Sequence, residues 1–184
     1  MGDITTIATD AMVNTAHFSL QAGSGLCRVI HQKGGKLLQD DCKQLLEELG
    51  HLSDSEVAVS VAGDLPAINV IHAVSPRWLG GDRNEEQLLL DTYTNILLKA
   101  DEIQAKTLSI PPLATGIHGF PKQRAAKIAM QAIINTLPNL IHTDKVLLVN
   151  SDTKNSFIYK IIFNTYADKI KNLQLETLLP GDFK

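Results

Sequence analysis

The chain reads Asp10-Ala11-Met12-Val13-Asn14-Thr15-Ala16-His17 near its start, with Gly2-Asp3-Ile4-Thr5 before it and Ala22-Gly23-Ser24-Gly25 after it. A second stretch of the same kind is Pro112-Leu113-Ala114-Thr115-Gly116-Ile117-His118-Gly119-Phe120-Pro121. In each stretch, a predicted strand ends in a glycine-containing turn that opens a helix. Glycine lets backbone N–H groups approach a ligand closely, and the N-terminus of a helix favours an anion. Two such loops facing one cleft predict a site that holds both phosphates of one ligand.

Composition and charge narrow the classes of protein to consider. The chain has 184 residues, which suits a single domain with a sizeable core. Its net charge is −3 at pH 7 and its pI is about 6.0, which argues against nucleic-acid binding. No apolar run is long enough to span a bilayer, so we expect no membrane association. The two cysteines, Cys27 and Cys42, fall in predicted helices, which favours free thiols and an intracellular location, cytoplasmic or nuclear.

Predicted strands and helices alternate along the chain. The strands are expected at 11–14, 57–62, 68–74, 107–110 and 145–149, and the segment 173–179 alternates like a further, half-buried strand. The helices are expected at 25–31 and 35–49, broken at Gly34-Gly35, and then at 88–100, 121–136 and 157–166. This order predicts an α/β fold of three layers, α-β-α, around a central mixed, largely parallel sheet. Ligands of such folds bind at the carboxyl ends of the strands, where both glycine loops belong.

At these residues the chain resembles the macro domain family, which binds ADP-ribose. The resemblance runs from Gly2 to about Tyr166, and the segment 57–129 also looks like the macro domain of the macro-histone variants. It implies one macro domain over residues 1–184. A typical macro domain has a strand before the Gly-Asp-Ile segment, where this chain has only Met1. The segment 173–179 is expected to fill that place in the sheet; a domain excised from a larger protein is equally compatible.

The resemblance implies how ADP-ribose, free or attached to a protein, would be held. Asp3 matches the acidic residue that accepts a hydrogen bond from the adenine amino group, with the backbone of Ile4 beside it. Two loops match those that cradle the phosphates through backbone N–H groups, and Asn150 falls where the family often places a side chain beside the adenine. No cofactor is expected. The implied ligand-binding residues are Asp3, Ile4, Gly23, Ser24, Gly25, Leu26, Thr115, Gly116, Ile117, His118, Gly119, Phe120 and Asn150.

Two positions depart from the pattern of the family's hydrolases. His17 stands where these enzymes usually have an asparagine that orients the distal ribose, and Cys27 where many have an aspartate that activates water. A binding protein is therefore the main interpretation. The alternatives are a hydrolase of ADP-ribosylated protein or O-acetyl-ADP-ribose, and a macro-fold interaction module whose cleft no longer binds nucleotide. If the protein is an enzyme, His17 and Cys27 are the catalytic candidates, as base and nucleophile.

A metal site is not expected from the sequence. A zinc site of His17, Cys27 and His118 lacks any ligand pair at a standard spacing. His72 lies on an apolar strand and is interpreted as a hydrogen-bonded core histidine, and Cys42 as a structural residue.

Overall fold

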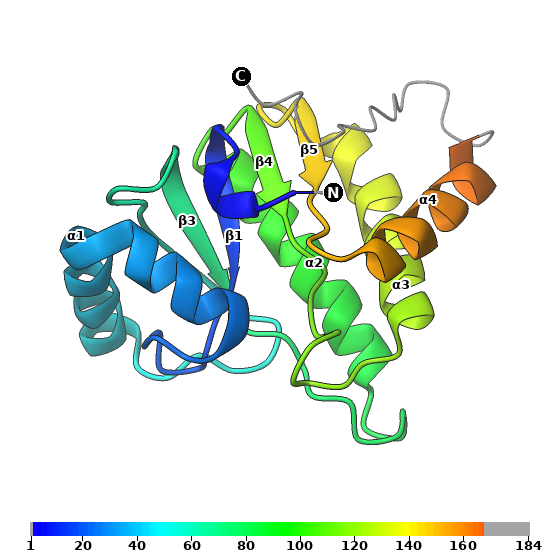
Figure 1. The fold of residues 1–184 in the computed structure, drawn as a ribbon, viewed down its shortest axis with the longest axis horizontal. Helices are drawn as coiled ribbons and strands as arrows, with labels where there is room; N and C mark the ends of the chain where they lie inside the picture. The colour runs from blue at the N-terminus through cyan, green and yellow to red at the C-terminus, as the bar shows by residue number, and fades with distance from the viewer. Residues whose placement is uncertain (1, 168–184) are drawn as a thin grey trace.

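The computed structural model describes residues 2–167 of the chain. A short 3-10 turn, η1, comes first, and the described residues then form one five-stranded sheet and four α-helices (Figure 1). In chain order the elements are η1 (Ile4–Thr6), β1 (Thr9–Thr15), α1 (Gly25–Leu49), β2 (Val57–Val61), β3 (Ala67–Ala73), α2 (Glu85–Glu102), β4 (Thr107–Ile110), α3 (Lys122–Thr136), η2 (Leu137–Asn139), β5 (Lys145–Leu148) and α4 (Thr153–Ala167).

The strand order in the sheet is β2-β3-β1-β4-β5. The pairs β3–β1, β1–β4 and β4–β5 are parallel, whereas β2 runs antiparallel to β3, to which a short turn connects it. A short turn can join only antiparallel neighbours, while the parallel pairs need longer crossover connections. The sheet is therefore mixed and largely parallel, as the sequence predicts. Its register places Asn14 of β1 beside His72 of β3, and their side chains are in contact.

Side chains of alternate strand residues fill two separate cores. On one face, Met12 and Val70 pack with α1, which together with η1 covers this side of the sheet. On the other face, Ala11, Val13 and Ile71 pack against residues of α2, α3 and α4. Both faces of the sheet are thus buried, which is the condition for a largely parallel sheet. The three-layer α/β fold predicted from the sequence is confirmed.

The expected break at Gly34-Gly35 is present as a kink within one long helix, α1. Gly35 has a φ of 69°, outside the helical range, and the backbone of Gly63 lies against that of Gly34. A Cβ added at Gly63 would lie 2.0 Å from the Gly34 carbonyl oxygen, so the two backbones can approach this closely only with glycine at residue 63. The kink lets the two halves of α1 lie over the sheet at different angles.

Two helices begin earlier than the sequence predicts. Helix α2 begins at Glu85 instead of residue 88, and α4 begins at Thr153 instead of residue 157. In α4 the reason is a capping interaction, because the Asp152 carboxylate accepts the Asn155 backbone N–H at 2.8 Å. The expected strand at 173–179 lies outside the described residues. In the part of the chain that the structure describes, no helix has the length and apolar character needed to cross a membrane.

Candidate functional site

A cavity of about 1130 Å³ opens where the parallel strands end. Residues directly after β1, β3, β4 and β5 line it, together with the N-terminal segment and the start of α1. This is the edge of the sheet to which the sequence assigned both glycine loops. The volume suits a ligand of nucleotide size or larger. Of the predicted site residues, those lining the cavity are Asp3, Ile4, His17, Gly23, Ser24, Gly25, Leu26, Cys27, Thr115, Gly116, Ile117 and His118.

The start of α1 forms the first anion-binding candidate. The helix begins at Gly25, and the Ser24 side chain makes no capping hydrogen bond to it. The first N–H groups of a helix have no acceptor within the helix, and among the described residues those of Gly25 and Leu26, which both line the cavity, have no acceptor outside it. Gly25 has a φ of 54°, which favours glycine, and a Cβ added there would meet nothing within 4 Å. The helix end therefore combines free donors, a favourable dipole and open space.

The loop after β4 forms the second candidate. Its two ends are fixed, because the buried Tyr93 hydroxyl accepts the Leu113 N–H at 3.0 Å and the Ala114 carbonyl accepts the Phe120 N–H at 3.0 Å. Between these anchors, within the described part of the chain, the N–H groups of residues 115–118 have no acceptor. Gly116 borders the cavity with open space beside it. The loop is thus held in place while its donors remain available for a ligand.

Three predicted site residues lie outside the lining of this cavity: Gly119, Phe120 and Asn150. The Gly119 N–H donates to the Gly116 carbonyl and so closes the loop. Phe120 is buried against Trp78, with 4.6 Å between the ring centroids. The Asn150 backbone carbonyl accepts the Gly2 N–H at 2.9 Å and thereby ties the N-terminal segment to the end of β5. These three residues therefore contact the segments around the cavity and are not part of its lining.

In the lining of the cavity, Asp3 is held by a cluster of donors. Its Oδ1 accepts from the backbone N–H and the hydroxyl of Thr5, and its Oδ2 accepts from Lys33 Nζ at 3.0 Å. Burial raises the pKa of the Asp3 carboxyl, but the hydrogen bonds from Thr5 and Lys33 outweigh it, so the pKa lies below its usual value. Asp3 is therefore an ionised acceptor at neutral pH, and a carboxylate has lone pairs left for a ligand donor.

Asn155, at the start of α4, also lines the cavity and was not predicted from the sequence. It is buried, and its amide nitrogen donates to Asp152 Oδ2 at 2.8 Å. Its Oδ1 has no hydrogen-bond partner among the described residues. A buried carbonyl oxygen without a donor costs free energy, which a ligand N–H or O–H would recover.

His17 and Cys27 both line the cavity, but their hydrogen bonds lead to other residues. The Ser19 backbone N–H lies 3.3 Å from His17 Nδ1, and the Ser19 hydroxyl lies 2.7 Å from the same atom. Because a backbone N–H can only donate, Nδ1 is the acceptor and the ring proton resides on Nε2. Cys27 Sγ receives the Gly23 N–H and donates to the Gln21 carbonyl. Within the described residues no hydrogen bond joins His17 to Cys27, so their pairing as base and nucleophile stays a prediction.

Among the polar lining residues that were not predicted as ligand-binding are Ser75, Arg77 and Lys122, which lie outside both glycine loops. The hydroxyl oxygen of Ser75, which follows β3, lies 3.3 Å from His118 Nδ1 and so orients that ring. Arg77 is exposed at the rim, and Lys122 lies at the start of α3, 3.4 Å from Asp152. Arg77 and Lys122 bring positive charge to the cavity, although Asp152, which pairs with Lys122, also lies in the lining.

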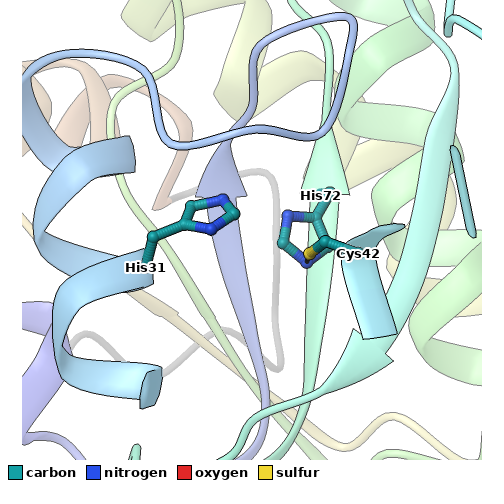
Figure 2. A group of neighbouring side chains, drawn as sticks. All are labelled: His31, Cys42 and His72. Carbon is teal, nitrogen blue, oxygen red and sulfur yellow. Dashed lines mark hydrogen bonds between the residues drawn. The ribbon is translucent and has the colours of Figure 1, made fainter. Parts of the chain in front are cut away.

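Metal ligands converge at another place. Among the described residues, His31, Cys42 and His72 place one ligand atom each within 4.8 Å of one another (Figure 2). The cluster lies between α1 and β3, on the sheet face opposite α2. This cluster differs from the combination of His17, Cys27 and His118 that was considered from the sequence.

A family model described as "Macro domain" matches residues 13–129. The chain belongs to the macro domain family. This macro domain is 45% identical over 173 residues to a macro domain-containing protein of Acinetobacter sp. (strain ED45-25), covering 94% of this chain and 93% of that one. It is 39% identical over 166 residues to the O-acetyl-ADP-ribose deacetylase of Klebsiella pneumoniae (strain 342), covering 90% and 95% of the two chains.

A solved structure agrees with these relatives. The Oceanobacillus iheyensis macrodomain with ADP superposes with a TM-score of 0.87 at 32% identity. The superposition covers 92% of this macro domain and 90% of the other chain. The family assignment therefore rests on sequence and fold together.

Proposed function

We propose that this macro domain binds ADP-ribose, and that it does so in the cavity at the carboxyl ends of β1 and β4. The observation that carries the proposal is the pair of unpaired donor groups, at the start of α1 and in the loop 115–118, on one cavity. Oriented N–H groups of this kind bind phosphate without a salt bridge. A diphosphate would contact both sets, with Arg77 and Lys122 adding positive charge.

The two ends of the cavity suit the two ends of ADP-ribose. Asp3 and the unpaired Oδ1 of Asn155 are acceptors, which match the amino group of adenine and the hydroxyls of its ribose. A carboxylate disfavours the carbonyl that guanine carries at the same position. At the other end, the Nε2–H of His17 offers a donor to the distal ribose or its neighbouring phosphate. The predicted ligand-binding residues remain a proposal that these features support.

Calorimetric titration with ADP-ribose tests the proposal, with AMP as the comparator. We expect ADP-ribose to bind with micromolar affinity and AMP much more weakly, because AMP lacks the second phosphate and the distal ribose. Absence of heat and of a thermal shift at high ligand concentration would contradict the proposal. That outcome would instead favour the interaction module whose cleft no longer binds nucleotide.

A hydrolase is the second candidate, because the Klebsiella pneumoniae relative at 39% identity is named O-acetyl-ADP-ribose deacetylase. Macro-domain hydrolysis can work largely by positioning substrate and water. In this chain His17 and Cys27 replace the asparagine and aspartate that the family resemblance implies for hydrolases. Turnover of O-acetyl-ADP-ribose or of a mono-ADP-ribosylated protein by the purified wild-type protein separates catalysis from binding alone.

Replacing His17 with alanine should weaken ADP-ribose binding about tenfold, the value of one lost hydrogen bond to a charged or polar ligand group. The affinity for AMP should not change, because AMP does not reach the distal-ribose end. Calorimetry with both ligands measures this difference. Histidine ¹⁵N chemical shifts check the mechanism, since the Ser19 contacts require the proton on Nε2. A proton on Nδ1, or equal losses for both ligands, would contradict the donor role.

Three finer expectations belong to this proposal. The likeness of residues 57–129 to the macro domain of macro-histone variants stays a prediction, because the relatives described above are bacterial. Recognition of ADP-ribose attached to a protein is proposed because the cavity opens to the surface beside the exposed Ile117. An intracellular location is consistent with two free cysteines, Cys27 and Cys42.

A further inference from the structure

A buried cluster of metal-ligating side chains lies apart from the proposed ADP-ribose cavity. His31 comes from the first half of α1, Cys42 from the second half beyond the kink, and His72 from β3 (Figure 2). Their exposed fractions are 2%, 3% and 0%. None of the three lines the cavity described above. The kinked α1 thus presents two ligands to one β3 histidine in a closed interior site.

One of these ligands has an unused nitrogen. His31 Nε2 has no hydrogen-bond partner in the described part of the chain. Imidazole nitrogens that are buried without a partner lose their hydration and gain nothing in return. The neutral form of an imidazole carries a lone pair that can bind a cation. The ring of His31 faces the ring of His72 across the cluster, with 5.9 Å between their centroids (Figure 2).

His72 has a partner that can prepare its other nitrogen for a metal. The Asn14 amide lies 3.0 Å from His72 Nδ1, and Asn14 Oδ1 has no partner among the described residues. The oxygen and the NH₂ group of a side-chain amide are nearly the same size, so the amide fits the same space in either orientation. With the amide turned over, Asn14 Oδ1 accepts a proton from Nδ1, and Nε2 presents its lone pair. In proteins, a hydrogen bond to the other ring nitrogen in this way orients metal-binding histidines.

The remaining nitrogen of His72 faces the third ligand. His72 Nε2 lies 3.5 Å from Cys42 Sγ and 2.8 Å from the Ser60 hydroxyl. Cys42 is only 3% exposed, so its sulfur lies inside the cluster. A cation would bind it as the thiolate with release of the thiol proton, since the thiolate is the form that ligates metals.

We propose that His31, Cys42 and His72 form a binding site for a thiophilic cation with a filled d shell, Cu(I) or Zn(II). Two imidazoles and one thiolate are the ligands that such ions prefer, and no carboxylate belongs to the set. With Cu(I) the thiolate leaves the buried site neutral. With Zn(II) one positive charge remains and a fourth ligand is needed, for which the Ser60 hydroxyl or a water is available.

The bound ion would act on stability. It would tie both halves of α1 to β3 through the three ligands. Ligands that bind only the folded state raise its stability. The proposal is independent of ADP-ribose binding, because the site shares no ligand with the cavity.

The test uses the full-length protein, reduced and freed of metal with a chelator. Cu(I) and Zn(II) are titrated separately in competition with a chromophoric chelator, and Co(II) replaces zinc as a spectroscopic probe. We expect one ion per chain, a thiolate-to-cobalt charge-transfer band and a raised melting temperature. Cu(I) alone, Zn(II) alone or both binding at this stoichiometry each support the site and identify its ion.

Variants locate the ion. Cys42→Ala and His31→Ala should each weaken binding more than about 100-fold, because each removes a ligand, whereas removing a residue that only hydrogen-bonds to a ligand typically costs about 10–100-fold. Cys27→Ser, which removes the other buried thiol, should leave the metal stoichiometry at one. Should the variants fail to fold, X-ray absorption of the wild-type complex decides instead, since it must show one sulfur and two imidazole nitrogens. No binding, or binding that survives Cys42→Ala, overturns the proposal.

Discussion

Replacing Gly116 with valine should weaken ADP-ribose binding by at least about 100-fold, or about 2.7 kcal/mol, without unfolding the protein. A Cβ at Gly116 meets nothing within 4 Å, and the backbone there does not require a positive φ. The new side chain would therefore enter the cavity instead of straining the loop. It would fill the space that a phosphate needs to reach the N–H groups of residues 115–118.

Gly116→Ala is the matched control for this variant. It removes the same backbone freedom of glycine but adds only one carbon, so its loss of affinity should be small. Calorimetry gives the affinities, and thermal unfolding should give nearly the same Tm for wild type and both variants. Unchanged affinity in Gly116→Val would mean that the ligand does not occupy this part of the cavity.

Replacing Glu85 with glutamine should lower the Tm by several degrees and weaken ADP-ribose binding. Glu85 is only 2% exposed, and its carboxylate accepts the backbone N–H groups of Leu79, Gly81 and Arg83 at 2.6–3.1 Å. Glutamine has one acceptor oxygen and turns an NH₂ group toward donors. The loop 79–83 would then lose its anchor.

This loop is coupled to the cavity through Trp78. The backbone N–H of Trp78 donates to the backbone carbonyl of His118 at 2.9 Å, and the indole ring of Trp78 packs on Phe120. A Cβ on Gly81 would lie 2.9 Å from the Trp78 ring, so the loop and the indole are in tight contact. Disorder at 79–83 should therefore reach the glycine loop 115–118.

The pH dependence of stability gives a second measurement on the same variant. Burial raises the pKa of Glu85, but the backbone N–H donors outweigh it and lower the pKa to about 2, from an ordinary 4.5. The carboxylate thus stabilises the fold fully above pH 4.5, and this contribution is lost as the pH falls from 4.5 toward 2. In Glu85→Gln, stability should fall less steeply over that interval.

Glu86→Gln provides the control for both measurements. The neighbouring Glu86 is half exposed and pairs with Arg124 at 3.0 Å on the surface. Exposed pairs of this kind contribute little to stability. Its Tm and acid unfolding should match those of the wild type; an equal effect of both variants would mean that the buried position of Glu85 is irrelevant.

Most of the fold could be predicted from local sequence signals. Buried strands such as 107–110 are short apolar runs between turns, and the expected and observed bounds of that strand coincide. The Gly34-Gly35 pair marked the kink in α1, because only glycine adopts the backbone angle needed there without strain. The helix starts at Glu85 and Thr153 were placed too late, since the apolar pattern begins after the polar first turn of each helix.

The candidate site was predicted where its residues are neighbours in sequence. Turn residues at the end of a predicted strand indicate each of the two glycine loops, and residues 23–26 and 115–118 do line the cavity. Asn155 and Arg77 carry no such local signal, because each is an isolated polar residue whose role depends on which loops lie beside it. Phe120 belongs to a predicted loop, yet packing against Trp78 turns it away from the cavity.

By itself, the sequence determined the layers of this macro domain and the positions of the two glycine loops that line its cavity. Both depend on short-range patterns, namely strand and helix periodicity and glycines at turns, whereas the adenine-binding role of Asp3 was implied only by the family resemblance and stays a prediction. Only the tertiary structure decided the partners of side chains distant in sequence. It brought His31, Cys42 and His72 into one closed site, because the kinked α1 packs across β3 and burial removes the water that would otherwise satisfy their polar atoms.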